Sequence, residues 1–330
     1  MSDTKASPAQ GSIEKKPNLI LSFFSRIFRG SGKKRRGPWW KPGLPTLIAF
    51  AVLATGVIVR VWDPDPVQTI RLRTFDMYNV VKPRVPLDPS PVIIVDIDEK
   101  SLAEVGQWPW PRTQVARLLT ALRDYGIAVV GFDIVFAELD RTSPDLLAKS
   151  REDLPESVRN SLAQTPANES IMADAMKTVR TVLGQASTQS TQALAPSDYA
   201  YTTSFKGALG TRDVPDPNDE LFKRAVRFPT LVYNRPELEQ FASGLGVFSI
   251  GEEVDGVVRR VPLVVHISDV IKPALSTEMI RVGFAGNSIF AFLTVGGISE
   301  VRLQTPRGNY PIPTDSKGQI WVYFAKPDSF

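Results

Sequence analysis

The chain has 330 residues, 43% of them apolar, and a formal net charge of +4 at pH 7. It contains no cysteine and a single histidine, His266, which excludes disulfides, thiolate chemistry and any site that needs several imidazoles. This composition is that of a globular chain, long enough for one large domain or two ordinary ones.

The first 42 residues hold ten Lys or Arg and two acidic residues, so the rest of the chain is negative overall. Because this basic segment leads directly into an apolar one, we expect it to lie at a membrane rather than to bind nucleic acid. Within it, residues 18–29 carry Ser and Arg on one helical face. The pattern predicts either a cationic amphipathic helix at the membrane surface or an unstructured basic linker.

Residues 43–59 contain no charge, and their 17 positions are the short limit of a transmembrane helix. Trp39, Trp40 and Trp62 flank this run, as aromatic residues do at membrane interfaces. The basic residues precede it, so the positive-inside rule predicts a cytoplasmic N-terminus and an exported remainder. A cleaved signal peptide and a buried soluble helix are the alternatives. The first lacks a small-residue cleavage site, and the flanking residues disfavour the second.

Residues 92–97 and 127–136 are short β-branched runs, which predict strands buried on both faces. Between them, four apolar residues recur at the spacing of one helical face: Val115, Leu118, Leu119 and Leu122. Pro111 and Gly126 suit the start and the end of this helix. The order strand, helix, strand predicts a right-handed βαβ crossover with parallel strands.

This crossover would collect polar residues at the carboxyl edge of its strands, where α/β sheets bind ligands. Asp96 and Asp98 end the first strand, Asp133 lies late in the second, and the loop from Trp108 through Trp110 to Arg112 would cap the same edge. One interpretation is a ligand or regulatory site. The other is a structural lock, in which Arg112 neutralises Asp96 or Asp133 and the tryptophans fill the edge.

The second half of the chain predicts further elements. We expect a polar excursion at 139–170, a helix at 171–179, a third strand at 181–185 and a long functional loop or insertion at 187–228. Asp255–Gly256 predicts a hairpin between strands at 246–250 and 256–267. On it, Arg259 and Arg260 form either an exposed cation pair or a salt bridge to the carboxylate cluster. A helix at 273–286 and strands at 301–303 and 320–324 follow.

Three runs, V-D-I-D-E-K-S-L from Val95, W-P-W-P-R from Trp108 and G-F-D-I-V-F from Gly131, resemble the CHASE domain of type 2. Phe75-Asp76, residues 138–141, residues 244–263, Ile312-Pro313 and Gly318 also match this family, so the similarity covers about residues 70–330. The resemblance implies an extracytoplasmic sensory domain attached to cyclases, histidine kinases or serine/threonine kinases in a bacterial inner membrane. It also implies a chain that is the amino-terminal portion of a longer receptor.

The expected architecture is an α/β, three-layer-like sensor domain with a mixed, partly parallel sheet built from βαβ units, preceded by one transmembrane helix. Residues 1–42 form a cytoplasmic tail, 43–62 the transmembrane helix and 63–330 the periplasmic or extracellular domain, truncated at its C-terminal end. The candidates for ligand binding or a structural lock are Asp96, Asp98, Trp108, Trp110, Arg112, Asp133, Arg259 and Arg260.

The resemblance implies a sensory input module that regulates an adenylate or guanylate cyclase absent from this chain. A kinase sensor is the first alternative. The second is a membrane-anchored enzyme that uses Asp96, Asp98 and Asp133 as paired carboxylates or hard-metal ligands. The third is an assembly scaffold that uses residues 187–228. We assign no catalytic residue, metal or cofactor. The expected partners are membrane lipid, an extracytoplasmic signal or small ligand, and a second copy in a homodimer, without nucleic acid.

Overall fold

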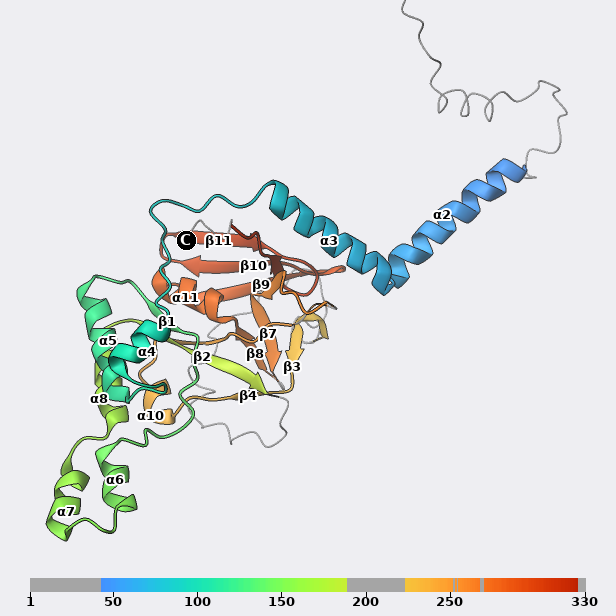
Figure 1. Cartoon of the computed structure of the whole chain (residues 1–330). Coiled ribbons are helices and arrows are strands. Elements are labelled where there is room, and N and C mark those ends of the chain that lie inside the picture. The colour runs from blue at the N-terminus through green and yellow to red at the C-terminus, as the bar shows by residue number, and fades with distance from the viewer. Residues whose placement is uncertain (1–42, 189–222, 252, 254, 268–269, 326–330) are drawn as a thin grey trace, which may run out of the picture. The chain divides into compact units, whose positions relative to one another are not determined.

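A computed structural model describes residues 43–188, 223–251, 253, 255–267 and 270–325 (Figure 1). The chain divides into two units, Met1–Pro64 and Asp65–Phe330. The predicted amphipathic helix at 18–29 lies outside the described residues, as does most of the predicted loop at 187–228.

The described part of the first unit is the helix α2 (Leu44–Trp62). It begins beside Pro45, a residue that suits a first helical turn, and ends at Asp63 in the left-handed conformation with φ of 45°. Its 19 residues have a mean hydropathy of 2.1, and none of them is buried against the protein. This helix agrees with the predicted span at 43–62 and is long and apolar enough to cross a membrane.

The second unit opens with α3 (Asp65–Val81), which buries Leu72. Next come α4 (Glu99–Val105) and α5 (Arg112–Asp124). The predicted helix after Pro111 is confirmed in α5, which buries Val115, Ala116 and Leu119. It is followed by Gly126 at φ of +77°, a left-handed conformation that glycine adopts without a steric penalty.

The first sheet is mixed and is centred on β2 (Thr181–Thr188). Two strands pair with β2 in parallel, β1 (Val130–Phe132) and β5 (Gly244–Val247), and β4 (Thr230–Val232) pairs with it antiparallel. The parallel partner of β1 is reached through α6 (Pro144–Ser150), α7 (Glu156–Gln164) and α8 (Asn168–Met176). The mixed, partly parallel α/β class is therefore confirmed, and so are the helix and the strand predicted at 171–179 and 181–185.

The remaining strands form three small sheets. In one, β7 (Val264–Ile267) pairs in parallel with β3 (Val226–Phe228) and antiparallel with β8 (Val270–Pro273). Another is an antiparallel meander of β9 (Ser288–Thr294), β10 (Gly297–Thr305) and β11 (Gly308–Pro313). The last pairs β6 (Arg260–Pro262) with β12 (Gln319–Trp321).

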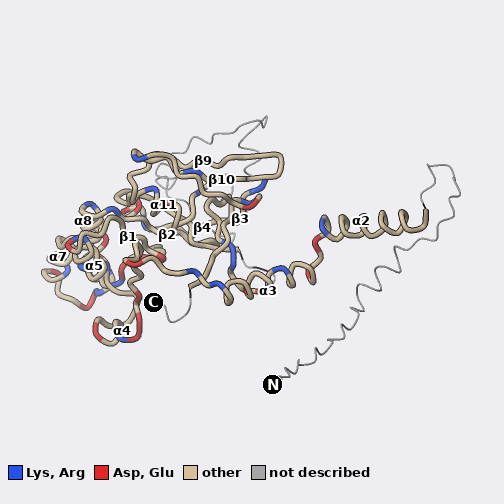
Figure 2. Tube along the Cα trace, turned by 90° about the horizontal axis from the view of Figure 1, so that it is seen from above, with Lys and Arg blue, Asp and Glu red and all other residues tan. Residues whose placement is uncertain are grey.

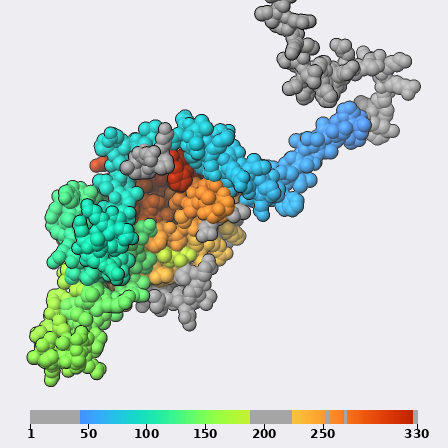
Figure 3. All heavy atoms as spheres, in the orientation of Figure 1, coloured from blue at the N-terminus to red at the C-terminus, as the bar shows by residue number. Residues whose placement is uncertain are grey.

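Two main apolar cores hold the second unit together. The first lies where α5 and α8 pack together and against the first sheet, and is centred on Leu119, Phe136, Met172 and Leu183. The second lies between the meander and the strands around Val264. The short α10 (Pro236–Glu239) contacts α8, while α11 (Leu275–Gly283) covers β5 and β2. Figure 3 shows α6 and α7 standing away from the rest of the second unit.

Two predictions about the strands are wrong. Residues 92–97 form no strand, and Val92, Ile93 and Ile94 are 67%, 74% and 81% exposed. An apolar run indicates that a segment can be buried, but it does not determine which strand the segment pairs with. Among the described residues, β2 is the strand that pairs with β1. The hairpin at Asp255–Gly256 is also absent. Its expected first strand, β5, pairs with β2, and β6 pairs with β12.

Candidate functional site

The W-P-W-P-R loop connects α4 to α5 and folds back on itself. The rings of Trp108 and Trp110 meet edge to face, with centroids 5.8 Å apart. The indole Nε1 of Trp110 donates a hydrogen bond of 2.8 Å to the carbonyl of Gly106. Edge-to-face aromatic pairs contribute stability beyond their buried area, so both rings have defined positions.

Arg112 is the first residue of α5 and is only 6% exposed. Its backbone N–H donates to Asp140 Oδ2 at 2.7 Å, its Nη2 donates to the carbonyl of Glu138 at 3.1 Å, and its guanidinium lies 4.6 Å from the centre of the Phe136 ring. Burial lowers the pKa of Arg112, and the nearby carboxylates of Asp140, Glu169 and Glu138 oppose this effect. Arg112 is thus a buried cation held by the segment that follows β1.

Asp140 joins three segments around Arg112. Besides the Arg112 N–H, it accepts hydrogen bonds from the backbone and hydroxyl of Thr142 and from Asn168 Nδ2 at 2.9 Å. Burial acts to raise the pKa of Asp140, but the hydrogen bonds from Arg112, Thr142 and Asn168 outweigh it and hold the pKa below its usual value. The carboxylate therefore links the start of α5 to the start of α8.

The carboxylates predicted at the sheet edge lie elsewhere. Asp96 and Asp133 are exposed, and Asp98 caps α4 by accepting from the Ser101 backbone N–H at 2.8 Å. Figure 2 shows acidic residues gathered over α4 and its flanks. Among the described residues none of these three contacts Arg112 through a hydrogen bond or an ion pair. Because residues 92–97 are outside the sheet, the edge that would have collected them does not form.

A cavity of about 240 Å³ lies beside Arg112. Its walls come from Trp108, Pro109, Arg112, the segment 134–138 and Val232. The Arg112 Nε is buried and has no hydrogen-bond partner in the part of the chain that the structure describes. Apart from Arg112 and Glu138, the lining residues are apolar, and the buried Arg112 offers one free donor, which suits a small ligand with an apolar body and one acceptor group. Trp110 does not line it.

Arg259 pairs with two carboxylates at once. It is 2% exposed, and its Nε and Nη2 each donate to one oxygen of Asp76 at 2.7 Å. Its Nη1 and Nη2 each donate to one oxygen of Asp255 at 2.8 Å. Hydrogen bonds from Arg259 lower the pKa of Asp76 and lower that of Asp255 to about 2, while the two carboxylates raise the pKa of Arg259.

The pairing of Arg259 fixes α3 to the sheet that β6 and β12 form, because Asp76 belongs to α3. Aromatic packing supports the same contact, since the Phe75 ring lies 4.5 Å from Trp321 and 5.6 Å from Tyr323, centre to centre. We call this set of residues, Leu72, Phe75, Asp76, Asp255, Arg259 and Trp321, the α3 anchor. Its members lie up to 249 residues apart in the sequence, between Leu72 and Trp321.

Arg260 has different partners from its neighbour. Its Nε and Nη2 each donate to Glu253 at 2.6 Å, its Nη1 lies 3.6 Å from Asp315, and its guanidinium is 5.3 Å from the Trp321 ring. Both arginines thus form salt bridges, and neither pairs with Asp96, Asp98 or Asp133 within the described ranges. Both alternatives predicted for these arginines, an exposed cation pair and a salt bridge to the carboxylate cluster, are therefore wrong.

Sequence reasoning missed a polar network inside the core. Gln185 lies between Glu239 and Lys272: its Nε2 donates to Glu239 Oε1 at 3.2 Å, and Lys272 Nζ donates to its Oε1 at 3.3 Å. Burial raises the pKa of Glu239 and lowers that of Lys272 to about 8. The available signal was a lysine within the apolar run V-I-K-P. The partners of Arg112 and Arg259, which are Asp140 and Asp76, both lie in segments that match the family, and this was the sequence signal for their importance.

The chain matches the family model of the CHASE2 domain over residues 47–330. It therefore belongs to the CHASE2 family, and its domain is an extracytoplasmic sensory domain of signalling receptors. Comparison with curated proteins and with solved structures finds no match.

Proposed function

We propose that this chain is the sensory input module of a bacterial receptor that controls a nucleotide cyclase, with adenylate cyclase as the first choice. The α3 anchor carries this proposal. In the sequence, α3 follows the membrane-length helix α2 after Asp63 and Pro64 alone. A helix that follows a membrane-length helix in the sequence and is fixed to a sensory domain by a buried arginine suits the transmission of a signal.

The mechanism requires two conformational states of the domain that differ in the contacts between α3 and the rest of the domain. A ligand shifts such an equilibrium only by the difference between its affinities for the two states. The double ion pair of Arg259 supplies this difference, because its geometry fails when either carboxylate moves away. The N-terminus lies in the cytoplasm and the CHASE2 domain lies outside the inner membrane in this proposal, and the receptor acts as a homodimer.

The effector distinguishes a cyclase receptor from a histidine or serine/threonine kinase receptor. The test is to isolate the native protein from its membranes with an antibody against the domain, and to assay it for cyclic nucleotide formation and for protein phosphorylation. Formation of cyclic AMP that changes in the Asp76→Asn variant supports the proposal. Phosphorylation without cyclase activity would show that the effector is a kinase. An output that is the same in the parent protein and in the Asp76→Asn variant would show that the α3 anchor does not transmit the signal.

A further inference from the structure

The cavity beside Arg112, which we call the Arg112 cavity, holds an unused hydrogen-bond donor. Arg112 is 6% exposed, and its backbone N–H and Nη2 donate to Asp140 and Glu138. Its buried Nε has no hydrogen-bond partner among the described residues. Buried donors are nearly always paired, because an unpaired one costs the free energy of its desolvation. Since Arg112 lines the cavity, an acceptor group inside the cavity would pair this donor.

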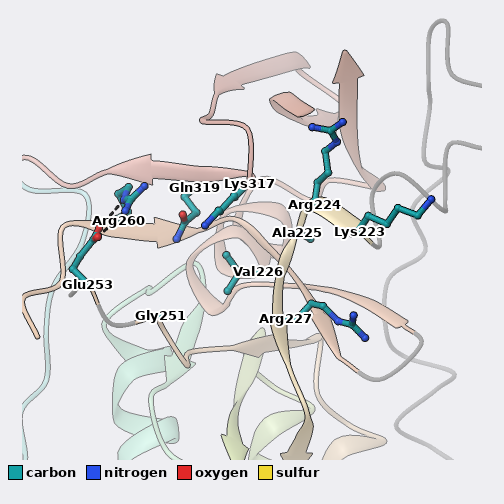
Figure 4. A pocket seen from close by; sticks show the side chains of 10 residues that line it. All are labelled: Lys223, Arg224, Ala225, Val226, Arg227, Gly251, Glu253, Arg260, Lys317 and Gln319. Atoms are coloured by element: carbon teal, nitrogen blue, oxygen red, sulfur yellow. Dashed lines mark hydrogen bonds and ion pairs between the residues drawn. The ribbon is translucent and has the colours of Figure 1, made fainter. Parts of the chain in front are cut away.

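A larger hollow of about 320 Å³, beside β3, β6 and β12, has no such donor (Figure 4). Its Arg260 is paired with Glu253 through two hydrogen bonds of 2.6 Å. Within the described part of the chain, none of the residues that line this hollow has a buried side-chain nitrogen or oxygen without a hydrogen bond. The evidence for a ligand is therefore at the Arg112 cavity and not at the larger hollow.

The surroundings of Arg112 determine which charge a ligand can have. Three carboxylates interact with its guanidinium, those of Asp140, Glu169 and Glu138. Asp140 and Glu169 are themselves buried. The cluster thus has one positive group and three negative ones, so it repels an anion. An uncharged oxygen, such as that of a carbonyl group, accepts from Arg112 without adding a fourth negative charge.

The walls of the Arg112 cavity are held by contacts of their own. The Trp108 ring packs edge to face on Trp110. The Phe136 N–H donates to the buried Asn234 Oδ1 at 2.7 Å, and the Phe136 carbonyl accepts from the Arg235 N–H at 2.8 Å. Walls that are already ordered favour binding, because little conformational entropy is lost when a ligand enters.

We propose that the Arg112 cavity binds a small uncharged molecule with an apolar body and one carbonyl-type oxygen, the chemistry of a ketone, an ester or an amide. The oxygen accepts from Arg112 Nε, and the body lies against Trp108 and Val232, which line the cavity. The volume of about 240 Å³ is below the range of about 300–1,000 Å³ that is typical of sites for drug-sized ligands, which limits the molecule to a small one.

The cavity is also placed to receive the signal, a step that rests on the proposed sensory function. Asn234, which holds Phe136, donates through its backbone N–H to Glu239 Oε1 at 3.1 Å. Glu239 belongs to the buried network with Gln185 of β2 and Lys272 of β8. A ligand that displaces Phe136 therefore acts on a network that connects the two sheets to which β2 and β8 belong.

The test uses three probe molecules that share an aromatic body and differ in one group. Acetophenone has an uncharged carbonyl oxygen, benzoate has a carboxylate, and ethylbenzene has no acceptor. Each probe is titrated calorimetrically into the full chain in detergent micelles at neutral pH, and a titration into micelles alone is subtracted. We expect saturable binding of acetophenone and about tenfold or more weaker binding of the other two. Ethylbenzene leaves Arg112 Nε unpaired, and benzoate adds a negative charge.

Two variants locate the site. Val232→Phe fills the cavity from β4 and leaves Arg112 in place, so it should weaken acetophenone binding about tenfold or more. Val158→Phe, the same substitution at an exposed position of α7 outside the cavity, is the matched control and binds as the parent chain does. Arg112→Lys keeps the charge but removes Nε, so acetophenone should lose its advantage over ethylbenzene. Ala137→Leu, also in the cavity wall, replaces Val232→Phe if that variant does not fold.

The absence of saturable acetophenone binding, or equal affinity in the parent chain and in Val232→Phe, overturns the proposal. Tighter binding of benzoate than of acetophenone would show that the ligand is an anion. Equal binding of ethylbenzene and acetophenone would show that Arg112 Nε does not contact the ligand, and either result contradicts the proposed class of ligand. These titrations measure binding alone, so the sensory function is decided separately by the output assays on Asp76→Asn.

Discussion

Arg259, at the residue before β6, holds Asp76 of α3 through two parallel hydrogen bonds of 2.7 Å. The two residues are 183 positions apart, and the guanidinium is almost completely buried, with 3% of its side chain exposed. Because the fork of an arginine matches a carboxylate in one geometry only, this contact fixes both the distance and the rotation of α3. The contact therefore ties α3, the helix that follows α2 in the sequence, to the rest of the sensory domain.

The first prediction concerns the strength of this anchor. Arg259→Ala removes a buried side chain together with its pairs to two carboxylates that are partly exposed, so we expect the free energy of unfolding to fall by more than about 1 kcal/mol, the upper value for an exposed pair. Urea denaturation of the chain in detergent, followed by tryptophan fluorescence, measures it. Arg123→Ala, which breaks an exposed pair with Asp124, is the control and should cost under about 1 kcal/mol. Equal losses in the two variants would contradict the anchor.

The second prediction concerns the stability of the domain at low pH. The pKa of Asp255 falls from 3.8 to about 2 on folding, and that of Asp76 is also lowered. The unfolded chain therefore binds more protons in this range, so the stability from these carboxylates is present above pH 3.8 and is lost as the pH falls towards 2. We expect the free energy of unfolding to decline over this window, and to decline less steeply in a double Asp76→Asn, Asp255→Asn variant. The same pH dependence of the free energy of unfolding in both proteins would show that Arg259 does not shift the pKa values of Asp76 and Asp255.

The third prediction concerns Arg112. Its side chain is buried against Phe136 and donates to the Glu138 carbonyl, so Arg112→Ala should lower the free energy of unfolding by about 3 kcal/mol or more. The Asp140 contact to its backbone survives the substitution, which limits the loss. Arg117→Ala, at an exposed position of the same helix, provides the control. A loss below about 1 kcal/mol for Arg112→Ala would show that the cation is solvated.

The fourth prediction separates the two tryptophans. Trp108 lines the cavity beside Arg112 and is 37% exposed, whereas Trp110 is tied to Gly106 and does not line it. If this cavity receives a signal, Trp108→Ala should change the output of the full-length receptor while its melting temperature falls only modestly. Trp110→Ala should act mainly on the melting temperature. Normal output from a folded Trp108→Ala receptor would assign this ring to packing.

The fifth prediction concerns orientation. Ten basic residues precede α2, so a reporter enzyme that is active only in the periplasm should be active when fused after Asp63. The same reporter fused after Gly37 should be silent. Immunoblots of the two fusions control for expression. The reverse pattern of activity would overturn the orientation and, with it, the extracytoplasmic position of the domain in this chain.

The sequence by itself was sufficient for features that depend on neighbouring residues. The uncharged run at 43–59 predicted α2, because burial of an apolar helix in lipid depends on length and composition alone. The helical spacing around Leu119 predicted α5, and the run at 181–185 predicted β2. The W-P-W-P-R motif indicated the family, which the match over residues 47–330 then confirmed.

Only the tertiary structure decided which distant residues meet. The spacing of charges does not encode a partner 183 positions away, so Asp76 could not be assigned to Arg259, nor Asp140 to Arg112. Likewise, the apolar run at 92–97 predicted a buried strand, yet the structure leaves it exposed and pairs β1 with β2. Local patterns fix how a segment prefers to fold, whereas strand pairing and ion pairs depend on which surfaces the whole chain brings together.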